Sequence, residues 1–263
     1  MSWSTLLIGF AAGALISTVT TPVGVSGAVF LLPVQLSVLA VPSPAVTPTN
    51  LLFNVVAGPG ALARYRRRGG LAGPLTRLLL AGTLPGVIVG AAIRVFAVPG
   101  PRVFRLIVAV LLLPLGVWLC GRALRPAQRG GPARRSEPSP RTITALALVV
   151  GTVGGIYGIG GGSILGPILV GRGMPVARVA PAALASTFVT SVAGAVTYGL
   201  LALVAPGDVA PNWTVGLACG LGGLLGGYAG ARLQPRLPER GLRLLLGVLA
   251  TGLATLYLLQ ASH

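Results

Sequence analysis

The chain has 263 residues, of which 54% are hydrophobic and only 9% are charged. Globular domains carry about a quarter charged residues, so this composition excludes an ordinary soluble fold. Glycine and proline are abundant, with 40 and 22 residues, but the high hydrophobicity excludes a disordered chain. The class of protein that tolerates both features is a polytopic membrane protein.

The formal net charge is +17, which in a soluble protein indicates nucleic-acid binding. Here all twenty basic residues are arginines that cluster between apolar segments, and the acids Glu137, Asp208 and Glu239 also fall between segments. We interpret the arginines as the positive charge that holds loops on the cytoplasmic side of a membrane. The expected partner is therefore a lipid bilayer and no nucleic acid.

Hydropathy divides the chain into ten apolar segments, five in each half. In chain order they cover residues 4–20, 24–41, 45–63, 73–95 and 103–122, then 143–157, 160–171, 179–204, 212–232 and 241–260. A full span takes about 20 residues, so the first two segments of each half are short, and the others are long enough to cross. The N-terminus lacks the basic region of a signal peptide, which predicts a retained first span.

The two halves resemble each other, which indicates a duplicated unit. A shift of 134 residues superposes one set of glycines and prolines on another, namely Gly24, Gly27 and Pro33 on Gly158, Gly161 and Pro167. We expect a membrane repeat over 1–122, a cytoplasmic linker over 123–142 and a second membrane repeat over 143–263. The predicted fold is an all-α polytopic membrane protein with two inverted repeats of about five segments each, roughly eight to ten in total.

An odd number of segments per repeat inserts the second copy upside down, and the arginines test this. If residues 64–77 and the linker face the cytoplasm, the inside loops hold seventeen arginines and the outside loops hold Arg94, Arg102 and Arg105. This excess predicts both termini outside. The same sidedness results whether the two short segments at the start of each half form a re-entrant hairpin or two spans.

The stretch GIYGIGGGSILGP at 155–167 is similar to a phosphate-binding loop. A P-loop requires a lysine, and the chain has none. A dinucleotide fingerprint requires an acidic residue about twenty positions on, and no acid occurs between Glu137 and Asp208. Cys120 and Cys219 are far apart and the only histidine is His263, so we expect no cofactor, no metal site and no enzyme activity.

Glycine is too dense at 24–27 and 158–162 for a stable helix, since each glycine costs about 1 kcal/mol against alanine. Pro33 and Pro167 follow and are predicted helix breaks. Unwound backbone inside a bilayer must be buried in protein or line a cavity. Paired interruptions in inverted halves indicate a transporter's substrate site, and exposed N–H groups at a half-helix start favour an anion.

Several other glycines, polar side chains and arginines have a purely structural interpretation as well, in helix packing or loop anchoring. Two glycine series with four-residue spacing suit close helix packing: Gly82, Gly86 and Gly90, and Gly222, Gly226 and Gly230. Hydroxyl and amide side chains in the spans either line a site or join helices. Four arginines at segment ends either anchor loops or attract an anion: Arg94, Arg172, Arg178 and Arg232.

The candidate substrate-binding residues surround the two glycine runs and the helices that follow them. Asn50 and Asn54 are spaced i, i+4 and share one helical face. The full set is Gly24, Ser26, Gly27, Asn50, Asn54, Gly158, Gly160, Gly161, Gly162, Ser163, Ser186, Thr187 and Ser191.

At these residues the sequence resembles the sulfite exporter TauE/SafE family of membrane permeases. The likeness spans nearly the whole chain. It is carried by GIGGGSILGPILV (158–170) and PVARVAPAALASTFVTSVAGAVTYG (175–199), with PVGVSGAVFLLP (22–33) and TNLLFNVVAGPGALARYRRRG (49–69) as first-half counterparts. The resemblance implies a multi-pass transporter of small anions, typically sulfite or organosulfur anions such as sulfonates, in the cytoplasmic membrane of a bacterial cell.

We therefore expect a secondary transporter that uses alternating access. An anion channel and a non-transporting membrane assembly protein remain as alternatives, and a homo-oligomer is left open.

Overall fold

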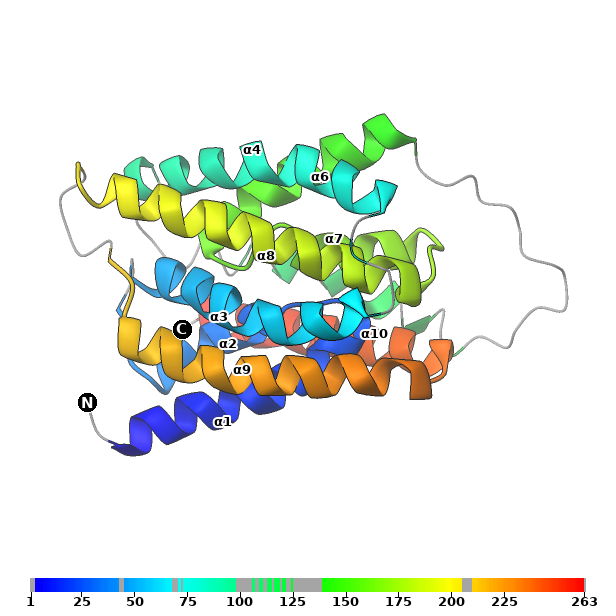
Figure 1. Cartoon of the computed structure of the whole chain (residues 1–263), viewed down its shortest axis with the longest axis horizontal. Helices are drawn as coiled ribbons and strands as arrows, with labels where there is room; N and C mark the ends of the chain where they lie inside the picture. Colours follow the sequence, from blue (N-terminus) through cyan, green and yellow to red (C-terminus); the bar gives the residue numbers. More distant parts are fainter. Residues whose placement is uncertain are drawn as a thin grey trace, which may run out of the picture.

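The structure is a computed structural model that describes residues 3–42, 45–67, 71, 73–97, 139–204 and 210–262, with isolated residues between 106 and 124. All regular structure in these ranges is helical (Figure 1). The long helices are α1 (Trp3–Thr20), α3 (Val46–Arg66), α4 (Pro74–Phe96), α6 (Pro140–Tyr157), α8 (Val176–Leu201), α9 (Trp213–Leu233) and α10 (Glu239–Ser262). The short ones are α2 (Ala28–Ser37), α7 (Gly162–Gly171) and the 3₁₀ turns η1 (Thr21–Val23) and η2 (Gln234–Arg236).

Six described helices are long and apolar enough to cross a membrane, namely α1, α4, α6, α8, α9 and α10. The protein is thus a multi-pass membrane protein, as predicted. The first segment of each half is longer than expected, because α1 and α6 each have 18 residues. Among the α-helices that the structure describes, α2 and α7, with 10 residues each, are too short to span alone.

Helix α3 departs from the expectation of an apolar span. Its 21 residues are long enough, but it is not among the six apolar helices, because Asn50, Asn54 and the terminal arginines lower its hydropathy. Both asparagines are buried. Helix α3 can be polar because it lies inside the bundle, between α8 and α9 (Figure 1).

The two prolines do not break helices, which corrects the prediction for Pro33 and Pro167. Each lies inside a short helix, Pro33 in α2 and Pro167 in α7. A proline removes the hydrogen bond to the carbonyl four residues earlier, which for Pro33 belongs to Val29. The Tyr257 hydroxyl donates to that Val29 carbonyl oxygen at 3.2 Å, so a neighbouring helix satisfies the freed group.

Two parallel helix pairs hold the bundle together, and both use glycine. A methyl group at Gly82, Gly86 or Gly90 of α4 would collide with successive carbonyl groups of α6. A methyl group at Gly222, Gly226 or Gly230 of α9 would collide in the same way with α1. Both predicted packing series are therefore confirmed: small residues let the backbones approach.

Between these pairs, α3 and α8 cross the centre in opposite directions. Leu51 packs beside Gly194, and Gly58 packs beside Phe188. The antiparallel register places the middle of α3, near Asn54, opposite the middle of α8.

Apart from Arg94, the arginines of the described residues gather at one end of the bundle. Helices α3, α7 and α9 end there, and α4, α6, α8 and α10 begin there, on the right of Figure 1. Arg94, in the last turn of α4, lies at the opposite end, toward which both chain termini point (Figure 1). The segment predicted at 103–122 and most of the linker at 123–142 fall outside the described residues.

Replacing Gly86 by alanine should destabilise the fold by about 1–3 kcal/mol, because overpacking forces the backbones apart. Its methyl group would lie 2.5 Å from the Leu148 carbonyl oxygen. Gly199 of α8 has open space around it, so Gly199→Ala should be neutral or slightly stabilising. Thermal unfolding of both variants in detergent measures the difference, and equal midpoints would contradict the packing role.

Candidate functional site

Two helix ends with the same backbone geometry create the breaks. Gly24 follows η1 with φ 78° and ψ 19°, and Gly158 follows α6 with φ 71° and ψ 19°. In both, the next residue donates its N–H to the carbonyl five positions back, Val25 to Thr20 and Ile159 to Gly154. This left-handed helix end favours glycine, which has no Cβ penalty there. The glycine-rich runs therefore end one helix and allow the chain to turn before the next.

The half-helices α2 and α7 begin directly after these turns, with Gly27 and Gly161 as their N-caps. Helix α2 runs from the centre toward the start of α1, while α7 runs from the centre toward the arginine end. Both N-termini consequently face the middle of the bundle. The Ser26 hydroxyl oxygen accepts the Ala28 N–H at 3.1 Å and so caps α2.

Asn54 connects the two breaks although 104 residues separate it from Gly158. The Ser26 hydroxyl donates to Asn54 Oδ1, and Asn54 Nδ2 donates to the Gly158 carbonyl oxygen at 3.4 Å. One turn earlier, Asn50 Nδ2 donates to the Ala28 carbonyl oxygen at 2.9 Å. The predicted pair on α3 thus faces both glycine runs.

The second break is surrounded by hydroxyl groups of α8. Thr187 Oγ1 lies 3.4 Å from Ser163 Oγ, and the Gly161 N–H donates to Thr190 Oγ1 at 3.4 Å. Ser186 Oγ lies 3.0 Å from Thr83 Oγ1 of α4. All thirteen candidate residues are buried.

Two of the candidates have polar atoms that are not satisfied. Asn50 Oδ1 and Ser191 Oγ are buried and have no hydrogen-bond partner among the described residues. Ser191 Oγ would lie 3.2 Å from a Cβ at Gly160, and Asn50 lies on the other side of the same turn, beside Gly158. A buried polar atom without a partner is costly, so the second break is a place where a ligand or a structural change would supply contacts.

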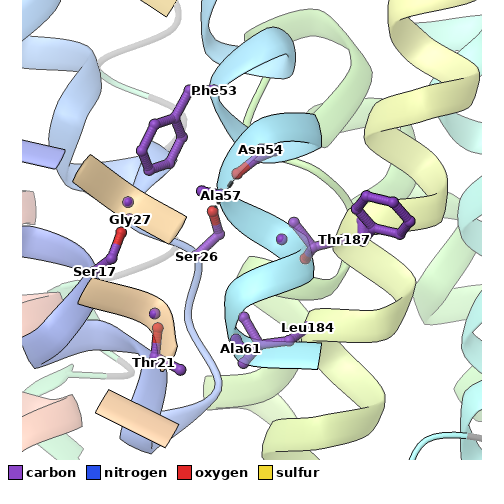
Figure 2. Close-up of a pocket in the computed structure, with 14 residues that line it drawn as sticks. Ser17, Thr21, Ser26, Gly27, Phe53, Asn54, Ala57, Ala61, Leu184 and Thr187 are labelled. Carbon is purple, nitrogen blue, oxygen red and sulfur yellow. Dashed lines mark hydrogen bonds between the residues drawn. The ribbon is translucent and has the colours of Figure 1, made fainter. Parts of the chain in front are cut away.

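A cavity of about 30 Å³ lies at the first break, between α1, α3, α8 and α9. Figure 2 shows Ser26 hydrogen-bonded to Asn54 in the middle of the view, with Ser17 and Thr21 on the left and Thr187 on the right. The lining residues of α3 continue from Phe53 through Asn54 and Ala57 to Ala61. The cavity therefore extends from the centre toward the arginine end.

The candidate residues divide between this cavity and the second break. Ser26, Gly27, Asn54 and Thr187 line the cavity, and the others surround it or the turn at 158–162. The sequence reasoning missed Ser17 and Thr21 on α1 and η1. Their i, i+4 spacing places both hydroxyls on one face at the end of an apolar helix, and this was the signal available.

No charged side chain of the described residues lines the cavity. Arg172, Arg178 and Arg232 are exposed at the arginine end. Arg94 is only 7% exposed and interacts electrostatically with Tyr157 and Tyr198 at the opposite end. The described site is therefore polar but uncharged.

The chain matches the family model of the sulfite exporter TauE/SafE over residues 8–257. It belongs to this family, and it is a membrane transporter of small anions, not an enzyme. No curated protein and no solved structure matches it.

Replacing Asn54 by leucine should lower stability by about 1–3 kcal/mol, because the Gly158 carbonyl loses its buried partner. Thr197→Val is the matched control, since the Thr197 hydroxyl bonds only to the Ala193 carbonyl of its own helix, at 2.8 Å. Thermal unfolding of both variants measures the contribution. An Asn54→Leu protein as stable as Thr197→Val would show that the bridge between the breaks is not stabilising.

Proposed function

We propose that this chain is a secondary transporter that moves small anions, sulfite or organosulfur anions such as sulfonates, by alternating access. The observation that carries the proposal is that two half-helix N-termini and a polar, uncharged cavity meet at Asn54 and Thr187. Such broken helices at the centre of a bundle are where transporters bind their substrates.

The preference for an anion follows from the direction of the half-helices. Each helix carries a partial positive charge at its N-terminus, where the first N–H groups have no helical partner. Helices α2 and α7 direct these ends to the centre. The described cavity lining adds hydroxyl donors and contains no carboxylate that would repel an anion or hold a cation.

Alternating access is supported by the paired geometry of the two halves. Gly24 and Gly158 share one conformation at a spacing of 134 residues, as inverted repeats would require. Helix α1 packs on α9 and α6 packs on α4 through equivalent glycine series, so the first helix of each half pairs with the fourth of the other. The repeat itself stays a prediction.

Under this repeat, the cavity has a closed counterpart at the second break. The glycine series align with a shift of 140, which pairs the cavity residues Gly223 and Gly227 with Thr83 and Val87. Thr83 packs so closely on Gly161 that a Cβ there would lie 2.5 Å from its methyl group. Bulkier side chains thus fill the space that glycines leave open in the first half.

The arginine end is the cytoplasmic end in this proposal, because positive residues remain on that side. Both termini then face outward from the bacterial cytoplasmic membrane. In this proposal the described conformation is the state whose cavity extends toward the cytoplasm, and a second state would open at Thr83, Val87 and Ser191.

Purified protein in liposomes should carry labelled sulfite or a small sulfonate with saturable kinetics and with stimulation by unlabelled anion on the other side. Ser17→Ala and Thr187→Val, both at the cavity lining, should reduce the flux about tenfold or more, the effect of one hydrogen bond to a charged ligand. Thr197→Val should keep wild-type flux. Saturable flux without stimulation would favour a channel, and no flux of any anion in the panel would contradict the transport proposal.

Cysteines at equivalent places in the two halves test the alternating states. Ala57→Cys lines the cavity, and Ser191→Cys lies 134 positions later in its closed counterpart. In a background with Cys120 and Cys219 replaced by alanine, an impermeant thiol reagent should modify Ala57→Cys only from the arginine side and Ser191→Cys only from the opposite side. Modification of both positions from the same side would contradict the two-state scheme.

A further inference from the structure

We propose that the central cavity selects anions by valence, admitting singly charged anions and excluding doubly charged ones. An oxyanion that titrates, such as sulfite, would then be carried as its protonated, singly charged form. The inference rests on the proposed function and names the charge state of its substrate.

The first step is the absence of a compensating charge at the described cavity. Its lining consists of apolar, glycine, hydroxyl and amide residues only. The charged or titratable side chains on the surrounding elements do not line it. They are Arg64, Tyr65, Arg66 and Arg67 at the end of α3, Arg178 and Tyr198 on α8, and Cys219, Tyr228 and Arg232 on α9.

The second step is the small number of donors that remain for a ligand. The Ser26 hydroxyl donates to Asn54 Oδ1, Asn54 Nδ2 donates to the Gly158 carbonyl, and the Ala28 N–H donates to Ser26 Oγ. The donors left on the cavity wall are the hydroxyls of Ser17 and Thr21, the second N–H of Asn54 and the Thr187 hydroxyl, which lies 3.4 Å from Ser163 Oγ. The partial charge of the α2 N-terminus adds to them.

The third step is the size of the cavity. A volume of about 30 Å³ leaves room for about two water-sized groups, because one needs roughly 10–15 Å³ by the same measure. A hydrated anion does not fit. The protein must therefore replace most of the hydration that the anion loses on entering.

Charge then decides which anion can be stabilised. The cost of removing an ion from water grows with the square of its charge, whereas its attraction to fixed dipoles grows only in proportion to the charge. Doubling the charge of the anion therefore quadruples the free-energy cost of dehydration but only doubles the stabilisation by the dipoles of the site. A site of a few neutral donors and one helix end that just offsets the cost of a single charge is therefore insufficient for a double charge.

Pairs of anions with one shape and different charge test this inference. Chlorate and sulfite are both three-oxygen pyramids, and perchlorate and sulfate are both tetrahedra. In proteoliposomes, chlorate flux should be independent of pH, while sulfite flux should fall as pH rises and the singly charged form disappears. Perchlorate should compete with chlorate, and sulfate should not.

The outcomes separate this inference from the proposed function. Sulfite flux that persists in alkaline buffer at the rate of chlorate, or competition by sulfate equal to that by perchlorate, would overturn valence selection and leave anion transport standing. No saturable flux of any of the four anions would instead contradict the proposed function, and valence selection with it.

Two variants with matched controls place the selection in this cavity. Thr21→Val should weaken chlorate binding about tenfold or more, whereas Thr18→Val should not, because the Thr18 hydroxyl donates to the Ala14 carbonyl of its own helix at 2.8 Å.

Ala61→Lys adds a cation to the cavity lining and should allow sulfate to compete. Ala63→Lys, on the exposed side of α3, should leave sulfate excluded. Sulfate exclusion that Ala61→Lys leaves unchanged in a folded protein would contradict the assignment to this cavity.

Discussion

The structure depends on hydrogen-bond partners for the backbone N–H and C=O groups at its two helix interruptions inside the bilayer. A membrane offers no water to unpaired N–H and C=O groups, so a chain that leaves the helical conformation must find partners within the protein. Asn54 donates directly to the Gly158 carbonyl at the second break. At the first break it acts through Ser26, whose hydroxyl donates to Asn54 and accepts the Ala28 N–H. This explains why a helix as polar as α3 occupies the interior: its amides replace the water that the two turns would otherwise need.

The chemistry of the centre follows from the same constraint. Ending two helices within the bundle directs the N-termini of α2 and α7 inward, and a backbone N-terminus attracts an anion without any charged side chain. The described cavity therefore binds through dipoles and hydroxyl groups, while the arginines stay at the ends of the helices. Arg94 is the buried arginine of the described residues. It interacts electrostatically with Tyr157 and Tyr198 and does not line the cavity.

Glycine serves two separate purposes in this molecule. In the α1–α9 and α4–α6 pairs it allows backbones to touch, which gives each pair a close and extended contact. At Gly24 and Gly158 it supplies a left-handed conformation that ends a helix. At Gly223 and Gly227, which line the cavity, the lack of a side chain leaves space beside α3.

The sequence by itself determined the membrane class, most segment positions, the two glycine breaks and the gathering of arginines at segment ends, because hydropathy, glycine density and charge are local properties. It also placed Asn50 and Asn54 on one face of a helix. Only the tertiary structure decided that Pro33 and Pro167 remain helical, that Asn54 joins turns over a hundred residues apart, and that Ser17 and Thr21 face the cavity. Membrane helices are apolar on most sides, so hydropathy does not reveal which face turns inward. That rotation is set by close glycine contacts between helices that are distant in sequence.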